Sequence, residues 1–73
     1  MTKVIKVTDG GKFNKTYPMS YVPEIGTNLK MPARKEDPDN VKYLLGCVKS
    51  VEYDVDSDLI TLFIPVVQYM QRN

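Results

Sequence analysis

The sequence predicts an all-β protein: a small antiparallel sheet of about five strands that curls or closes into a small barrel. Short runs of β-branched and aromatic residues are separated by clusters of turn residues. Residues 41–55, the longest periodic segment, carry apolar or aromatic side chains at seven of their eight odd positions, which is the period of a strand. No segment has the apolar stripe of a three-turn helix. We expect one domain over residues 1–73.

The N-terminal part of the chain predicts a hairpin. Residues 3–8 (KVIKVT) are rich in β-branched residues and predict the first strand. Residues 9–11 (DGG) predict the turn that follows, because glycine accepts a positive φ. Residues 13–21 place most of their apolar side chains at odd positions and predict the second strand. Pro18 has no N–H for a ladder, so this strand must lie at a sheet edge or break there.

The middle of the chain predicts a turn, a short strand and a loop. Residues 22–26 (VPEIG) contain the proline and glycine of a turn, and residues 27–31 (TNLKM) predict a short strand. Residues 32–40 (PARKEDPDN) hold two prolines and five charged residues. Because nothing in this segment needs burial, we expect a mobile, solvent-exposed loop.

The C-terminal part predicts a long bent strand and a final strand. In residues 41–55 the odd positions form the expected apolar face, which places Cys47 in the interior as a small hydrophobic residue. Gly46 marks a bulge or bend, or divides the segment into two strands. Residues 59–67 (LITLFIPVV) are apolar on both faces, as in a strand covered on both sides. Residues 68–73 extend this strand or form one helical turn.

The order of these elements resembles that of SH3-like barrels. In residues 22–67 a loop with proline and glycine (VPEIGTNLKMP) leads into a strand and is followed by a long bent strand and a final hairpin. This resemblance implies an SH3-like small barrel as the way in which the sheet closes. It is a pattern of element types, and it implies no function.

Composition limits the class of protein. The net charge of +1 argues against a surface devoted to nucleic acid, although residues 1–35 carry +5 (seven basic, two acidic) and residues 36–73 carry −4 (three basic, seven acidic). No apolar run reaches the length of about 18 residues that a membrane helix needs, and the N-terminus lacks the apolar core of a signal peptide. We therefore expect a cytoplasmic protein without membrane contact, in the host cytoplasm if it is phage-encoded.

Three aspartates at alternate positions, Asp54, Asp56 and Asp58, suggest either a calcium loop or a hairpin turn. A calcium loop of the EF-hand type that starts at Asp54 requires glycine at its sixth position and glutamate at its twelfth. Leu59 and Pro65 occupy those positions. We therefore expect a turn around residues 56–58, where aspartate and serine side chains bond their own backbone, and no metal site.

Catalytic residues and cofactor motifs are not recognisable in the sequence. The chain has no histidine, which removes the commonest general base and nucleophile activator. Gly10, Gly11 and Lys12 lack the spacing of a phosphate-binding loop. The sequence therefore predicts a protein that is not an enzyme and that binds no cofactor.

Binding of single-stranded nucleic acid is one functional hypothesis. Small barrels bind single strands by stacking bases on aromatic rings while basic side chains neutralise phosphates. The same odd positions also fit a core face, and the acidic residues of the chain oppose such binding. The residues that interleave the two types, or extend the patch through the loop, are Lys12, Phe13, Lys15, Tyr17, Tyr21, Arg34 and Lys35.

Binding to a protein is the hypothesis we favour. The strand predicted for residues 59–67 is apolar on both faces, and so small a domain has too few other elements to bury both of them. This predicts an interface with a target protein or a homodimer. The acidic residues can present spaced negative charge to a basic surface, while aromatic residues anchor the complex; the same acids also serve as a solubilising face. The candidate partner-binding residues are Tyr43, Glu52, Tyr53, Asp54, Asp56, Asp58 and Phe63.

The size of the chain and its use of Lys, Asn and Tyr resemble those of the short accessory proteins made by bacteriophages and other bacterial mobile elements. This resemblance implies stoichiometric binding to a host protein, as an inhibitor or adaptor. The implied partner is a host enzyme or a nucleic-acid-binding protein whose working surface is covered.

Overall fold

The computed structural model describes residues 2–71, which form seven strands and no helix. The predicted all-β class is therefore confirmed, and residues 2–71 contain no helix long and apolar enough to cross a membrane. The strands are β1 (Lys3–Thr8), β2 (Asn14–Met19), β3 (Asn28–Pro32), β4 (Val41–Cys47), β5 (Ser50–Asp54), β6 (Leu59–Phe63) and β7 (Val67–Gln71).

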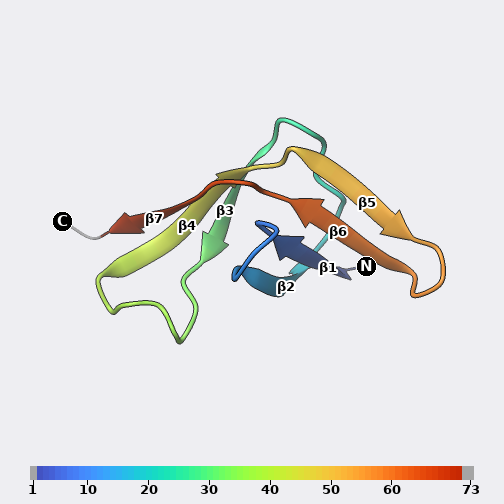
Figure 1. Ribbon diagram of the computed structural model, residues 1–73. Helices are drawn as coiled ribbons and strands as arrows, with labels where there is room; N and C mark the ends of the chain where they lie inside the picture. Colours follow the sequence, from blue (N-terminus) through green and yellow to red (C-terminus); the bar gives the residue numbers. More distant parts are fainter. Residues whose placement is uncertain (1, 72–73) are drawn as a thin grey trace.

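The strands form two sheets, which Figure 1 shows at an angle to each other. One sheet has four strands in the order β2-β1-β6-β5, and the other has three in the order β3-β4-β7. Neighbouring strands are antiparallel except for β1 and β6, which run parallel. Among residues 2–71 neither sheet closes on itself, so the SH3-like barrel is not observed.

Seven strands replace the expected five because two long segments each contribute to both sheets. The segment 41–54 is interrupted after Cys47, and the segment 59–71 is interrupted after Phe63. The four pieces form one long bent hairpin, since β4 pairs with β7 and β5 pairs with β6 (Figure 1). The predicted last strand is therefore divided, and residues 68–71 belong to its second piece. Residues 72–73 lie outside the described residues.

The bend in this hairpin is held by backbone hydrogen bonds to the rest of the molecule. On one strand the Val48 N–H donates to the Thr27 carbonyl, and the Val48 carbonyl accepts from the Gly26 N–H. On the other strand the Ile64 N–H donates to the Thr8 carbonyl. The side chains of Val48 and Ile64 are both buried, so the bend is also packed against the core.

The core lies between the inner faces of the two sheets. Ile5, Val7 and Leu62 come from the four-stranded sheet, and Leu44 comes from the three-stranded sheet; all four have no solvent exposure. Burial of each such side chain contributes about 1.5–3 kcal/mol. The cluster is completed by Phe13, Tyr17, Met31, Val41, Val48 and Ile64.

The expected apolar face of residues 41–55 is wrong in β4 beyond Val41. The register shifts between Val41 and Tyr43, where β4 contains one residue more than β7. Such a bulge moves the later side chains of β4 to the opposite face. Leu44, Gly46 and Val48 therefore face the core. Cys47 is exposed instead of buried.

Gly46 has a packing role inside β4, whereas the chain bends two residues later. It is buried, and a Cβ at this position would collide with Ile64 Cγ2. A glycine here lets the second bent strand pass close to the first. Glycine is therefore required at this position of β4 because the Ile64 side chain packs directly against the Gly46 backbone.

The predicted first hairpin is confirmed. Asp9 Oδ1 accepts hydrogen bonds from the Gly11 N–H (2.8 Å) and the Phe13 N–H (3.2 Å), and Gly10 adopts a φ of 87°. Pro18 lies in β2, where it pairs with Val4 of β1, and β2 is an edge strand as predicted. The proline removes a backbone donor from this edge of the sheet.

Candidate functional site

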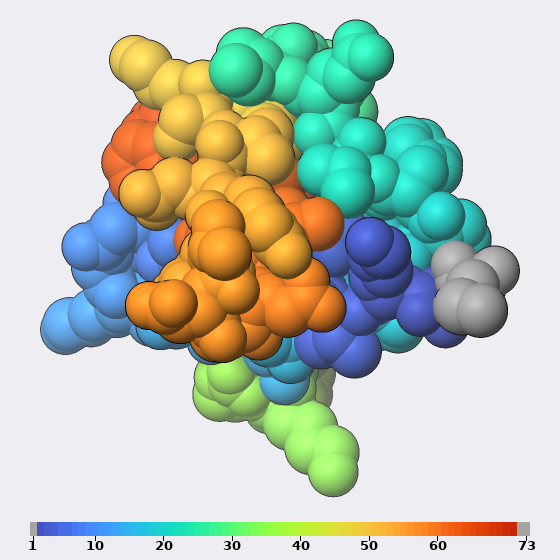
Figure 2. Space-filling model, turned by 90° about the vertical axis from the view of Figure 1, so that its right-hand side faces the viewer, coloured from blue at the N-terminus to red at the C-terminus, as the bar shows by residue number. Residues whose placement is uncertain are grey.

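The β5–β6 hairpin, residues 50–63, extends away from the core of an elongated molecule of 42 × 22 × 22 Å (Figure 1). Every residue of β5 is exposed. Exposed fractions are 37% for Val51, 56% for Tyr53 and 78% for Val55, which follows β5 in the turn. Figure 2 looks onto this hairpin, drawn in yellow to orange, and no other segment covers it on this side. These apolar side chains are therefore open to a partner.

The two faces of β5 differ in chemistry because side chains alternate along a strand. On the face that continues the core, Val51 pairs with Leu62 and Tyr53 with Ile60. On the opposite face lie Glu52, which pairs with Thr61, and Asp54, which pairs with Leu59. The hairpin therefore presents an apolar face and an acidic face.

The turn of the hairpin confirms the interpretation of the aspartates as turn residues. Asp54 Oδ1 accepts hydrogen bonds from the Asp56 N–H (3.0 Å) and the Ser57 N–H (3.4 Å). Asp58 adopts a φ of 56°, in the left-handed region that aspartate tolerates better than most residues. Within residues 2–71 no group of three His, Cys, Asp or Glu side chains is placed to hold a metal ion.

The carboxylates of the hairpin carry uncompensated charge. Among residues 2–71, none of Glu52, Asp54, Asp56 and Asp58 forms an ion pair. The Tyr53 hydroxyl donates a hydrogen bond to Asp58 Oδ1, and this bond raises the pKa of Tyr53 above its usual value. Tyr53 therefore stays protonated at neutral pH, with its hydroxyl directed toward the turn.

Five of the seven predicted partner-binding residues come together on β5 and the turn that follows it, whereas Phe63 lies at the far end of β6 and Tyr43 lies on β4. Tyr43 is half-buried on the outer face of the three-stranded sheet, where Lys30 Nζ lies 4.5 Å from its ring centroid. Phe63 is half-buried on β6 beside the first hairpin, since a Cβ at Gly10 would lie 3.0 Å from Phe63 Cε1. Neither ring joins the exposed surface of β5.

Sequence reasoning missed Val51 and Val55, because alternation assigned both to a buried face. The carboxylates between and after them were the signal that could have found them. Carboxylates are rarely buried without partners, so a strand that alternates them with valine is expected near solvent.

The residues of the nucleic-acid hypothesis do not form an exposed stacking surface. Phe13 and Tyr17 belong to the core, at 3% and 9% exposure, while Tyr21 is 74% exposed in the loop after β2. The lysines of the set, Lys12, Lys15 and Lys35, are exposed. The structure thus offers basic side chains without two of the rings that were expected to accompany them.

Arg34 is held by the loop it belongs to. It forms two side-chain hydrogen bonds with Asp37, at 2.7 and 3.1 Å, and its backbone N–H donates a third at 2.8 Å. Its guanidinium also stacks on Phe13, at 4.6 Å from the ring centroid. These hydrogen bonds lower the pKa of Asp37 below its usual value.

The expectation that residues 32–40 have nothing to bury is therefore wrong at one position. Most of the loop is exposed, but Asp37 retains only 9% exposure. A charged side chain is buried there because its partner comes from the same loop. The charge of Arg34 is correspondingly neutralised.

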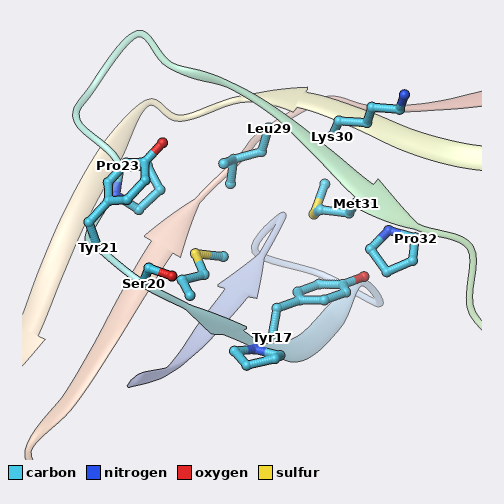
Figure 3. A pocket seen from close by; sticks show the side chains of 10 residues that line it. Tyr17, Ser20, Tyr21, Pro23, Leu29, Lys30, Met31 and Pro32 are labelled. Atoms are coloured by element: carbon cyan, nitrogen blue, oxygen red, sulfur yellow. The ribbon is translucent and has the colours of Figure 1, made fainter. Parts of the chain in front are cut away.

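An apolar groove of about 370 Å³ separates the edge strands β2 and β3 (Figure 3). Figure 3 shows side chains from β2 and the loop after it facing those of β3, while Lys30 points away. The Tyr17 hydroxyl is buried at this groove without a hydrogen-bond partner, and burial raises its pKa. The groove has the size of a small ligand pocket.

Comparison with known proteins gives no match: no protein-family model, no curated protein and no solved structure is significantly similar to this chain.

Proposed function

We propose that this chain is a small, non-catalytic binding protein that acts by stoichiometric contact with another protein. In this role it resembles the inhibitors and adaptors that bacteriophages and mobile elements direct against host proteins, and it would act in the host cytoplasm. The contact surface is the β5–β6 hairpin.

The observation that carries this proposal is the exposure of β5. Val51 and Tyr53 lie on the face that continues the core, yet no other element covers them. Val55 extends the apolar surface into the turn with 78% exposure. Exposed apolar side chains that adjoin one another mark interaction surfaces, whereas isolated ones are ordinary.

The apolar face of the hairpin contributes mainly to affinity, and the acidic face contributes mainly to the association rate. Tyr53 is the anchor, because a tyrosine that loses water on binding contributes more than most contacts. Glu52, Asp54, Asp56 and Asp58 direct the approach to a basic surface and raise the association rate. Host enzymes and nucleic-acid-binding proteins have such surfaces, which makes them the expected partners.

The absence of histidine from the sequence supports a non-catalytic role. Glu52 and Asp54, which are the paired carboxylates of the chain, lie on an exposed strand. Enzymes hold their acid–base groups in clefts that enclose the substrate, and an open strand provides no such enclosure.

The predicted homodimer is a secondary part of the proposal. It rested on an uncovered face of the last strand, but Leu62 and Ile64 are fully buried there. The uncovered apolar surface lies on β5 instead. Light scattering that finds a monomer at high micromolar concentration would remove the homodimer and leave the hairpin proposal intact.

Capture of the partner from bacterial lysate tests the proposal. Wild-type protein is expected to retain one protein in fixed ratio, and Tyr53→Ser and Val55→Ser are expected to lose it. Tyr69→Ser and Val66→Ser are matched controls, since both side chains are exposed and neither belongs to the β5–β6 hairpin, and they are expected to keep the partner. Equal loss in all four variants, or capture of no protein, counts against the hairpin as a binding surface.

Single-stranded nucleic acid remains the alternative ligand, and the same purified protein tests it. Nucleic-acid binding would be strong at low salt, would weaken steeply as salt rises and would be reduced by Lys12→Ala or Lys15→Ala. The core positions of Phe13 and Tyr17 favour the protein-binding proposal over this alternative.

A further inference from the structure

The free edge of β5 is the part of the hairpin that the proposed function leaves undefined. β5 pairs with β6 alone, so its second edge carries backbone N–H and C=O groups that have no strand partner. In an antiparallel ladder, the backbone groups of alternate residues point to each side. Every second residue of β5 therefore offers a donor and an acceptor to an added strand.

The opposite edge of the same sheet is less suited to accept a strand. β2 forms that edge and contains Pro18, which provides no N–H. Proline is one of the features by which proteins block unwanted pairing at an edge. β5 contains no proline, and its pairing with β6 is regular over all five residues. No strand blocks the free edge of β5, and every residue of β5 retains its backbone N–H.

The side chains of β5 define what an added strand must carry. One face presents Val51 and Tyr53, and the other presents Glu52 and Asp54. A strand placed beside β5 sends its own side chains alternately to these two faces. An added strand would match both faces of β5 if its side chains were apolar beside Val51 and Tyr53 and complementary to carboxylates beside Glu52 and Asp54.

Charge identifies the second set of residues. Glu52 and Asp54 form no ion pair among residues 2–71, and a hollow of about 300 Å³ lies beside them, lined also by Thr61 and Lys6. Lys6 is separated from Glu52 by the intervening Thr61 in the register of the sheet. The acidic face at the free edge is therefore uncompensated, and basic side chains are its complement.

A second copy of this chain, paired through this edge in the symmetric register, is disfavoured as the occupant by the same charges. Antiparallel pairing of two β5 strands about their midpoint would place Glu52 opposite Glu52 and Asp54 opposite Ser50. Like charges directly opposite in a sheet are destabilising. Self-association through this edge is therefore opposed, although the backbone is free.

We propose that the edge of β5 binds an extended segment of a partner protein in which lysine or arginine alternates with apolar residues, adding it as a fifth strand to the four-stranded sheet. This inference rests on the proposed function and names the partner's chemistry. Backbone hydrogen bonds supply affinity, and the alternation of side chains supplies specificity. The five residues of β5 match a segment of about five or six residues.

Synthetic peptides of about eight residues test the proposal with the wild-type protein. A peptide that alternates lysine with valine is expected to bind, and to protect β5 amides from hydrogen exchange. Two controls separate strand addition from simple attraction of charge. One has the same composition with its lysines grouped at one end, and the other is N-methylated at alternate residues so that one backbone edge cannot donate. Both are expected to bind about tenfold more weakly or worse.

A charge exchange provides the matched variant. Glu52→Lys with Asp54→Lys is expected to weaken the lysine peptide about tenfold and to favour a peptide that alternates glutamate with valine. Both residues are exposed, but the Asp54 carboxylate also accepts two hydrogen bonds in the turn. Glu52→Lys alone, which keeps the turn, should show the same change of preference, and circular dichroism verifies the fold of both variants. Equal binding of the N-methylated or grouped-lysine peptide would overturn strand addition. Capture of a partner from lysate is measured without these peptides, so failure of the peptide test would leave the proposed function unaffected. Conversely, failure to capture a partner would contradict the proposed function without changing the measured peptide binding.

Discussion

β4 and β5 are consecutive parts of one bent strand, but they differ completely in burial. In β4, Val41, Leu44 and Gly46 are buried and the strand lies between two neighbours. In β5 every residue is exposed and one neighbour is present. The two strands have similar β propensity, so propensity does not decide which of them is buried. The layer that lies opposite each strand decides it.

This difference leads to separate expectations for stability and for the proposed binding within the same strand. Substitutions in β4 are expected to change the free energy of unfolding, because its side chains fill the core. Substitutions in β5 are expected to change binding while they leave the fold intact, because its side chains touch little of the rest of the protein.

The largest expected effect is at Leu44. Leu44→Ala removes a fully buried side chain and should lower the free energy of unfolding by about 2–5 kcal/mol, which approaches the whole stability of a domain of this size. Leu45→Ala, on the outer face of the same strand, should cost about 1 kcal/mol or less. Urea denaturation followed by circular dichroism measures both. A larger loss at Leu45 than at Leu44 would show that the core face of β4 is assigned wrongly.

The next effect is at Gly46. Gly46→Ala places a Cβ against Ile64 and should destabilise the fold by about 1–3 kcal/mol through overpacking. Gly11→Ala is the control, because a Cβ there meets Asp9 Oδ1 at an ordinary 3.5 Å. We expect the denaturation midpoint to fall for Gly46→Ala and to stay close to wild type for Gly11→Ala. Equal midpoints would contradict the close packing of the two bent strands.

A smaller effect concerns the buried carboxylate of Asp37 and is measured through the pH dependence of stability. The folded-state pKa of Asp37 lies below its usual 3.8, so its ion pair with Arg34 stabilises the fold above that pH and is lost as pH falls through the folded-state value. Asp37→Asn should cost about 1–3 kcal/mol at neutral pH and flatten the loss of stability in acid. Lys35→Gln, at an exposed position of the same loop, is the control and should keep the wild-type loss of stability in acid. Thermal melts between neutral pH and pH of about 3 measure this contrast.

Local patterns were sufficient to predict the hairpins from the sequence. Asp9, Gly10 and Gly11 specify a turn by their own chemistry, and Asp54 bonds the backbone two and three residues later. Pro18 indicated an edge strand because the missing N–H is a property of the residue itself. None of these inferences needed a contact between distant parts of the chain.

Features that depend on distant contacts were not predictable in this way. The bulge near Lys42 reverses the faces of β4, and alternation counted over the whole segment cannot show a single unpaired residue. Cys47 was misplaced for that reason. The Arg34–Asp37 pair was hidden in a loop whose composition indicates only exposure. At the candidate site, the sequence predicted Tyr53 and the acidic residues as partner-binding residues. The exposure of Val51 and Val55 was not predictable, because it depends on the absence of a layer over β5.

The hydrogen-bonded bend between the two sheets also determines how much order is lost when a partner binds. Because Val48 and Ile64 are buried and their backbone groups are bonded to other strands, the hairpin is already ordered in the free protein. A partner segment would therefore meet a preformed template, and the entropy lost on association would come mainly from the partner's own chain. A strand that is fixed at its bend and paired along its length with β6 can discriminate between segments by their side chains.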